Sequence, residues 1–205
     1  EPLPGLMLRL EVEPLGMLFA LVAGVLWFIT SIYAIGYMRG HHEQNQTRFY
    51  ALFAISIGSA MGVAFAGTLF PLFFFYEMLT LSTYPLVVHR GTEAARRAGQ
   101  TYLIYTVFGG ALLLVGTVWL YSLTGTLEFI PRGFISTLDP AHNSALIMIF
   151  ILLIAGLGVK AALFPFHGWL PQAMVAPAPV SALLHAVAVV KAGAFGIVRV
   201  VYDVF

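Results

Sequence analysis

The chain has 205 residues, of which 60% are hydrophobic and only 9% are charged, whereas soluble domains are about 45–50% apolar and about 25% charged. A formal net charge of +1, with no basic run interleaved with aromatics, argues against a nucleic-acid partner. The absence of cysteine excludes disulfides, thiolate metal sites and iron–sulfur ligation. These values predict an all-α integral membrane protein.

The predicted elements follow from uncharged stretches long enough to cross a hydrocarbon core, which needs about 20 residues per helix. Residues 1–14 form an N-terminal segment, and residues 15–205 form a transmembrane bundle of about six helices. The sequence starts at Glu1 without an initiator methionine or signal peptide, so we expect a piece of a longer protein. The expected spans are 15–37, 49–69, 72–88, 101–123, 145–170 with a break, and 179–203.

The loops between these spans differ in charge, and Lys and Arg accumulate on the cytoplasmic side of a membrane. Two alternate loops are basic, whereas the others hold a single arginine, so residues 1–14 are expected on the outer side. In a bacterial cell this multi-pass protein would lie in the inner (plasma) membrane. The basic loops contain Arg39 and Arg48, and Arg90, Arg96 and Arg97; the single arginine is Arg132.

The fifth predicted span is interrupted. The stretch from Gly156 to Pro179 reads GLGVKAALFPFHGWLPQAMVAPAP, with Gly156 and Gly158 before a lysine and four prolines after it. Proline removes a backbone donor and clashes with the preceding turn, so the helix should unwind near Phe164–Pro165. Non-helical backbone at membrane depth is tolerated inside protein or beside a water-filled cavity. The break therefore predicts an aqueous path.

Two further residues belong to this predicted break. Pro171 prolongs the interruption, and His167 lies beside it. The histidine either sits at a channel mouth or caps a loop, and the second reading is favoured.

Three charged residues lie deep inside predicted spans. Lys160 and Lys191 are the only lysines, and Glu77 is flanked on both sides by long uncharged sequence. A charge at the bilayer centre costs on the order of 2.5–3.5 kcal/mol, so such residues face the bundle interior and tend to pair. We expect a buried network in which ionisation of one group changes the proton affinity of the next.

His185 is a candidate relay between the two lysines, because histidine titrates near neutrality. On a regular helix Lys191 would lie about 120° around and about 9 Å along from His185, so water or a polar side chain would have to bridge them. Other readings stay open: a structural ion pair for Glu77, lysines that reach a membrane interface, and a satisfied interior histidine.

The same residues resemble a known family. KAALFPFHGWLP, from Lys160 to Pro171, followed by QAMVAPAPVSALLHAVAVVKAGAFGIVR to Arg199, resembles the signature of the antiporter-like subunits shared by respiratory complex I and Mrp-type cation/proton antiporters. FFFYEMLTLSTYPLV around Glu77 and VEPLGMLFALV near Glu13 are similar to further segments of that family. Within it, the chain looks most similar to the D-type subunit of Mrp antiporters and its complex I counterpart.

The resemblance implies that Glu77 pairs with Lys160 of a discontinuous helix, and that His185 and Lys191 pass protons towards the subunit centre. It also implies two inverted repeats of five helices, an arrangement found in many transporters. The spans from 49 to 203 would be the first repeat, and the second is absent from this sequence.

These features predict a proton-translocating subunit of a multisubunit membrane complex, with H⁺ and, as a further candidate, Na⁺ as cargo. Its expected partners are other membrane subunits and lipid. We expect no catalytic residue, cofactor or metal site in this chain and no nucleic-acid partner, although a place in a proton-translocating NADH-quinone oxidoreductase stays open. The alternatives are a structural subunit that scaffolds such a complex and a self-contained small-solute transporter; the missing second repeat argues against the latter.

Overall fold

The computed structural model of the chain describes residues 8–135 and 140–205, and these are mostly helical. Part of the predicted outer segment, residues 1–7, lies outside the described residues. The helices are α1 (Pro14–Gly40), α2 (Gln46–Ala64), α3 (Leu69–Val87), α4 (Glu93–Thr124), α5 (Asn143–Lys160), α6 (Trp169–Ala173), α7 (Ala178–Ala182) and α8 (Val189–Asp203), with short turns η2 (Pro140–His142), η3 (Phe166–Gly168) and η4 (Leu183–Val187).

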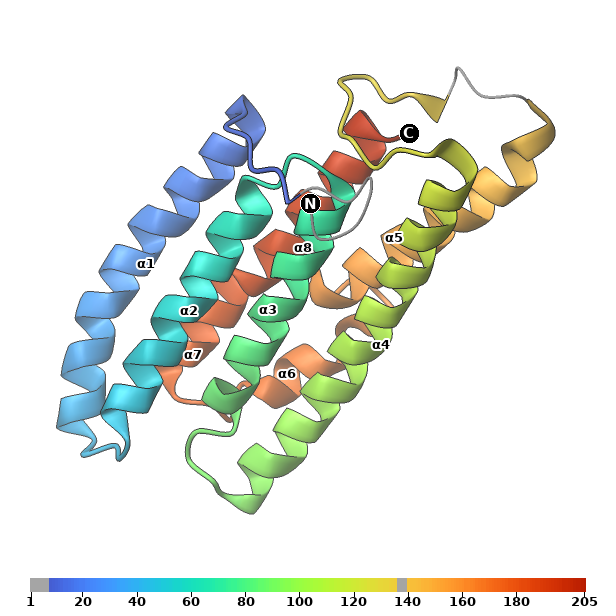
Figure 1. Cartoon of the computed structure of the whole chain (residues 1–205). Helices are drawn as coiled ribbons and strands as arrows, with labels where there is room; N and C mark the ends of the chain where they lie inside the picture. Colours follow the sequence, from blue (N-terminus) through green and yellow to red (C-terminus); the bar gives the residue numbers. More distant parts are fainter. Residues whose placement is uncertain (1–7, 136–139) are drawn as a thin grey trace.

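The long helices run side by side, so that alternate loops lie at opposite ends of the bundle (Figure 1). The α1–α2 and α3–α4 loops share the lower end, where Arg90 of one loop forms an ion pair with Glu43 of the other at 2.7 Å. The α2–α3 and α4–α5 connections lie at the upper end together with the end of α8. The two basic loops therefore meet on one face, and the cytoplasmic location of that face stays a prediction.

Five helical stretches of the described residues are long and apolar enough to cross a membrane: Pro14–Gly40, Gln46–Ala64, Glu93–Thr124, Asn143–Lys160 and Ala178–Asp203. The expected all-α membrane fold is thereby confirmed. The remaining predicted span corresponds to α3, which has 19 residues, as α2 does. Helix α3 includes Glu77 and several proline, serine, threonine and tyrosine residues, which lower its mean hydropathy although it packs between α2 and α4.

Glycines allow α5 to approach its neighbours closely. A Cβ placed at Gly156 would lie 2.7 Å from the carbonyl oxygen of Gly109 on α4. A Cβ at Gly193 on α8 would lie 2.4 Å from the backbone nitrogen of Ala161, directly after α5. Small residues permit such contacts between membrane helices, where van der Waals packing drives association. The end of α5 is therefore fixed between α4 and α8.

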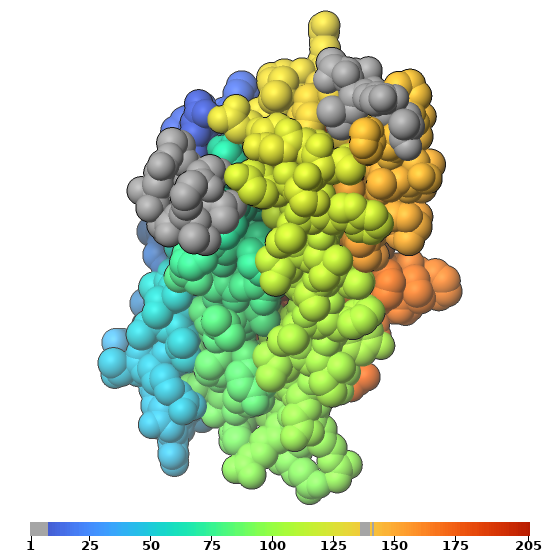
Figure 2. Space-filling view, turned by 45° about the vertical axis from the view of Figure 1, so that its right-hand side comes forward, coloured from blue at the N-terminus to red at the C-terminus, as the bar shows by residue number. Residues whose placement is uncertain are grey.

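The chain breaks earlier than the prolines suggest. Helix α5 ends at Lys160, whereas the sequence predicts unwinding near Phe164–Pro165. Ala162 follows with a positive φ of 53°, and the indole nitrogen of Trp169 donates to the Val159 carbonyl at 2.8 Å, which satisfies one acceptor of the open helix end. The segment after α5, orange in Figure 2, projects from the side of the bundle. The bilayer would therefore meet backbone that is not helical, unless further protein covers it.

A buried ion cluster joins α1 to α8 near the upper end. Arg199 is 4% exposed and donates to the carboxylates of Glu13, just before α1, and Asp203, the latter at 2.7 Å. Its guanidinium lies 4.2 Å from the centroid of the Phe129 ring. We call Glu13, Arg199 and Asp203 the Arg199 cluster.

Candidate functional site

The side chain of Lys160 is completely buried at the C-terminal end of α5. Its amine donates to the backbone carbonyl of Tyr76 and to the hydroxyl of Thr80, the latter at 2.9 Å. The nitrogen also lies 3.4 Å from the centroid of the Tyr76 ring, a cation–π arrangement. A position at a helix C-terminus favours a positive charge as well. The amine is thus held by uncharged partners.

These partners come from one face of α3, because residues three and four apart are neighbours on a helix. Tyr76 and Thr80 lie one turn apart and both are fully buried. The Tyr76 hydroxyl donates to the carbonyl of Gly156 at 2.7 Å. This bond ties α3 to α5 one turn before Lys160, so the two helices cannot separate without losing it.

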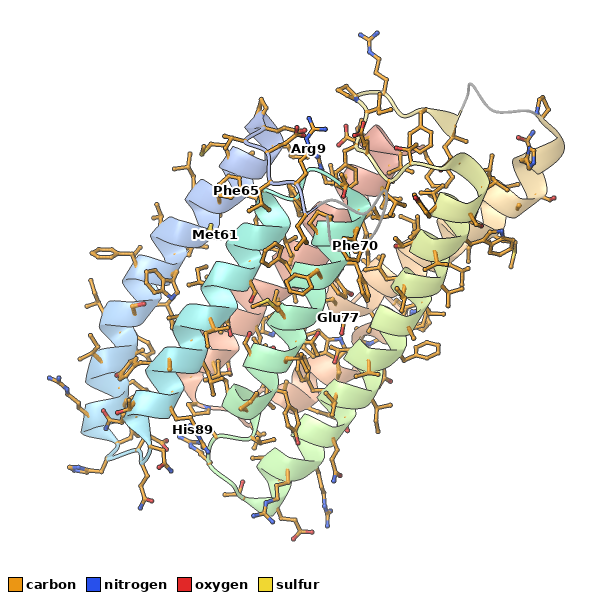
Figure 3. All side chains as sticks on the ribbon, in the orientation of Figure 1. Arg9, Met61, Phe65, Phe70, Glu77 and His89 are labelled. Atoms are coloured by element: carbon orange, nitrogen blue, oxygen red, sulfur yellow. The ribbon has the colours of Figure 1, made fainter. Side chains whose placement is uncertain are left out.

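Glu77 follows Tyr76 and lies midway along α3, on the side that faces α4 (Figure 3). Its Oε1 atom is buried and has no hydrogen-bond partner among the described residues. A Cβ at Gly110 would come within 2.3 Å of that oxygen, so the carboxylate fits because α4 has a glycine there. Glu77 and Lys160 interact electrostatically, although no ion pair joins them in the described part of the chain.

Further hydroxyl groups follow α3 from Thr80 towards the lower end of the bundle. Thr83 donates to the Leu79 carbonyl at 2.6 Å, with the Thr80 carbonyl further away at 3.2 Å. Its hydroxyl lies 2.6 Å from that of Tyr102 on α4. Thr80, Thr83 and Tyr102 are all fully buried. A polar line therefore leads from the Lys160 amine towards the face that holds the basic loops.

His185 and Lys191 are placed differently from Lys160. His185 lies in the π-helical turn η4, where the Ala188 amide donates to the Leu183 carbonyl at 3.0 Å, and it is exposed. The expected rotation of 120° and rise of 9 Å assumed a regular helix between His185 and Lys191. The structure shows that this segment is not a regular helix. Lys191 is half-buried and lies two residues before Gly193, which contacts the backbone just after Lys160. π-Turns are rare in proteins, and many of those that occur are at functional sites.

The predicted break residues divide into two sets. Gly156 accepts from Tyr76, and Gly158 accepts from the Leu163 amide at 2.9 Å, so both shape the buried end of α5. Pro165, His167 and Pro171 are exposed. His167 stacks loosely on Phe164, with ring centroids 5.8 Å apart.

Sequence reasoning missed four residues that surround the two predicted charges: Tyr76, Thr80, Gly110 and Tyr102. Only Tyr76 and Thr80 could have been found from the sequence. They are four residues apart, so they share a face of α3, and both are close to Glu77 in the sequence. No group of three His, Asp or Glu residues suited to a metal ion occurs within residues 8–135 and 140–205. The chemistry that the site can support is proton exchange at a buried amine near a half-buried carboxyl.

The fold and this site define a class: a multi-pass membrane protein with an interrupted helix and a buried lysine–glutamate centre. Residues 66–205 match the family described as NADH:quinone oxidoreductase/Mrp antiporter, transmembrane. Residues 5–50 match the N-terminus of chain 5 of NADH-ubiquinone oxidoreductase (complex I). The chain belongs to the NADH:quinone oxidoreductase/Mrp antiporter membrane family, as the sequence resemblance predicted.

A relative and two solved structures illustrate this membership. The A-type subunit of the Na(+)/H(+) antiporter of Alkalihalophilus pseudofirmus is 36% identical over 202 residues, which cover 97% of this chain and 24% of the relative. The chain thus spans about a quarter of that protein's length. Because this relative is of the A type, the resemblance to the D-type subunit stays a prediction.

Both structures are those of membrane complexes. A chain of the archaeal membrane-bound sulfane sulfur reductase matches with a TM-score of 0.82 and 30% identity, over 93% of this chain and 38% of that one. A chain of the Mrp complex from Dietzia sp. DQ12-45-1b matches with the same TM-score and identity, over 95% and 21%. Membership of a multi-pass membrane protein family is therefore established for this chain.

Proposed function

We propose that this chain is part of a proton-translocating subunit of a multisubunit membrane complex, and that Lys160 and Glu77 carry the proton step. The observation on which this depends is the full burial of the Lys160 amine among uncharged partners, with the unpartnered Glu77 oxygen on the same helix as those partners. A buried ion pair serves structure best when both charges are matched and hydrogen-bonded. Here the charges are separated.

Separation leaves the proton on Lys160 free to respond to its surroundings. When Glu77 approaches the amine, the opposite charge favours the ammonium form; when it withdraws towards Gly110, burial favours the neutral amine. The proton released from the ammonium would pass to His185 and Lys191 through water or polar side chains. Supply of a proton along Thr83 and Tyr102 from the lower face fits the same geometry.

The relatives support the wider context of the proposal. The Alkalihalophilus relative is a Na(+)/H(+) antiporter subunit, and one matching structure is a respiratory membrane complex. We therefore propose that the complex exchanges a monovalent cation such as Na⁺ for H⁺, or couples proton movement to redox chemistry in another subunit. The other membrane subunits are its partners.

The test uses the full-length protein in its intact complex, reconstituted into vesicles that contain a pH-sensitive dye. Glu77→Gln and Lys160→Ala should each lower proton movement by about 100-fold, the contribution expected of a positioned proton-transfer group. Glu93→Gln is the matched control, because it removes a carboxylate whose ion pair with Arg97 is largely exposed. Unchanged proton movement in both site variants would overturn the proposal. Loss of the intact complex on a native gel would instead indicate a scaffolding role.

A further inference from the structure

A polar pocket lies at the lower end of the bundle, beyond the contacts of Lys160 on α3. It has a volume of about 550 Å³ and is lined mainly by the first turn of α2, the end of α3 and the first turns of α4. An adjoining pocket of about 430 Å³ shares Asn45, His89 and Arg90 with it. Figure 3 shows His89 at the lower end of α3, where these elements meet.

The walls of the larger pocket carry an excess of positive charge. Arg90 is neutralised by Glu43, to which it donates from two nitrogens at 2.8 and 2.7 Å. Arg48 and Arg96 also line the pocket, and neither forms an ion pair with a residue in the described ranges. Two unpaired guanidinium groups thus face the same pocket, and guanidinium forks match phosphate geometry.

His89 adds an unsatisfied buried group. It is 8% exposed, its ring packs edge-on against Phe49 at 5.3 Å, and its Nδ1 has no partner among the described residues. Burial lowers the pKa of His89, and the nearby Arg48 lowers it further. The ring nitrogen bonded to the Gln44 backbone is Nε2, so Nδ1 donates to an anionic oxygen in the protonated ring, a form that a bound anion favours.

The N-terminus of α2 also favours an anion in this pocket. The first turn of α2 contains no acidic residue, and its N-cap Asn45, with a φ of 55°, makes no side-chain hydrogen bond to the helix. The free amide groups and the positive end of the helix dipole favour an anion here. In contrast, α4 is capped by Thr92 and has Glu93 in its first turn.

We propose that this pocket binds the phosphodiester group of an anionic phospholipid. It lies where three membrane-spanning helices end, which is the level of the lipid headgroups, and it is on the face with the basic loops. Basic pockets between membrane helices on that side bind such headgroups. Val88 and Pro85 in the wall give the glycerol and upper acyl carbons an apolar surface. Free inorganic phosphate offers the same oxygens but makes no apolar contact.

The experiment titrates the delipidated full-length protein with short-chain phosphatidylglycerol, short-chain phosphatidylcholine or inorganic phosphate, and follows binding by thermal shift. Phosphatidylglycerol should bind saturably and more tightly than the other two. Each basic residue near such a surface contributes about fivefold in affinity, so the double variant Arg48→Gln/Arg96→Gln should bind about 30-fold more weakly.

Arg97→Gln is the matched control, because Arg97 neighbours Arg96 but lies outside both pockets and is paired with Glu93. It should bind phosphatidylglycerol as the unaltered protein does. The charge-conserving Arg48→Lys/Arg96→Lys variant should retain most of the affinity, which guards against a folding defect in the glutamine variant. Equal affinity for inorganic phosphate would overturn the lipid assignment in favour of a free-anion site. Phosphatidylglycerol affinity unchanged in the glutamine variant would overturn the pocket itself.

Discussion

Two buried cations, Lys160 and Arg199, lie in neighbouring helices and have opposite kinds of partners. Arg199 donates to two carboxylates, from Glu13 and Asp203, and its charge is matched where it stands. Lys160 has a carbonyl, a hydroxyl and an aromatic ring around its amine, and the nearest acid interacts with it without forming an ion pair. The acid–base chemistry of each side chain is suited to its partners.

Arginine keeps its proton in proteins, whereas a buried lysine readily exchanges one. A permanently charged arginine between two carboxylates is a fixed connection between α1 and α8. A lysine held by uncharged groups can exist in either protonation state without breaking an ion pair. Under the proposed function, Arg199 at one end of α8 stabilises the bundle, and the proton moves at the end of α5.

The largest expected effect comes from removing the fixed connection. Arg199→Ala leaves the carboxylates of Glu13 and Asp203 without their shared cation, and loss of one partner of a buried ion pair costs about 3–5 kcal/mol. The thermal stability of the solubilised protein should fall accordingly. In the triple variant Arg199→Met/Glu13→Gln/Asp203→Asn no charge is left unmatched, so much of the stability should return. A stable Arg199→Ala protein would contradict the assigned role.

Exchange of the two cation types sharpens the comparison. Lys160→Arg keeps the positive charge but not an exchangeable proton, so proton movement in vesicles should fall by about 100-fold, equivalent to about 2.7 kcal/mol. Arg199→Lys should leave proton movement within about twofold, because that residue only has to remain charged. Equal losses in the two variants would show that the buried cations do not differ in role.

A smaller effect is expected at the glycine that faces Glu77. The added methyl group in Gly110→Ala would lie 2.3 Å from Oε1 and must displace the carboxylate, and overpacking typically costs about 1–3 kcal/mol. Proton movement should fall about tenfold. Gly24→Ala on α1, where a Cβ meets nothing within 4 Å, is the control and should have no effect. If the two alanine variants behave alike, the position of Glu77 is not critical.

The smallest effect concerns His89, a third buried ionisable group, which has neither carboxylate partners nor a polar cage. Its pKa is lowered from 6.5 by burial first, then by Arg48 and Arg90, against opposing contributions from Glu43 and the Gln44 backbone. The unfolded chain therefore takes up this proton at a higher pH than the folded one does. Stability should fall as pH drops below about 6.5, and His89→Gln should reduce that slope in melting curves. A slope unchanged by the substitution would contradict the assignment.

The sequence predicted the positions of the interior charged residues better than it predicted what surrounds them. Glu77 and Lys160 could be identified because charges are rare in apolar spans. The prolines after Lys160 predicted the helix break. The break itself lies closer to Lys160 than predicted, because Trp169 folds back onto the end of α5. Neither the π-turn at His185 nor the pairing of Glu13 with Arg199, 186 residues apart, has a local signal.

Composition and the lengths of the uncharged stretches by themselves determined that this chain is an all-α membrane protein with charged residues inside its spans, because a helix needs about 20 apolar residues to cross a bilayer. The tertiary structure alone decided which groups face those charges. Lys160 donates to Thr80, 80 residues earlier in the sequence, because α3 and α5 both pack against α4. The close packing of α5 against α4 and α8 depends on glycines of all three helices, and no single helix contains this information.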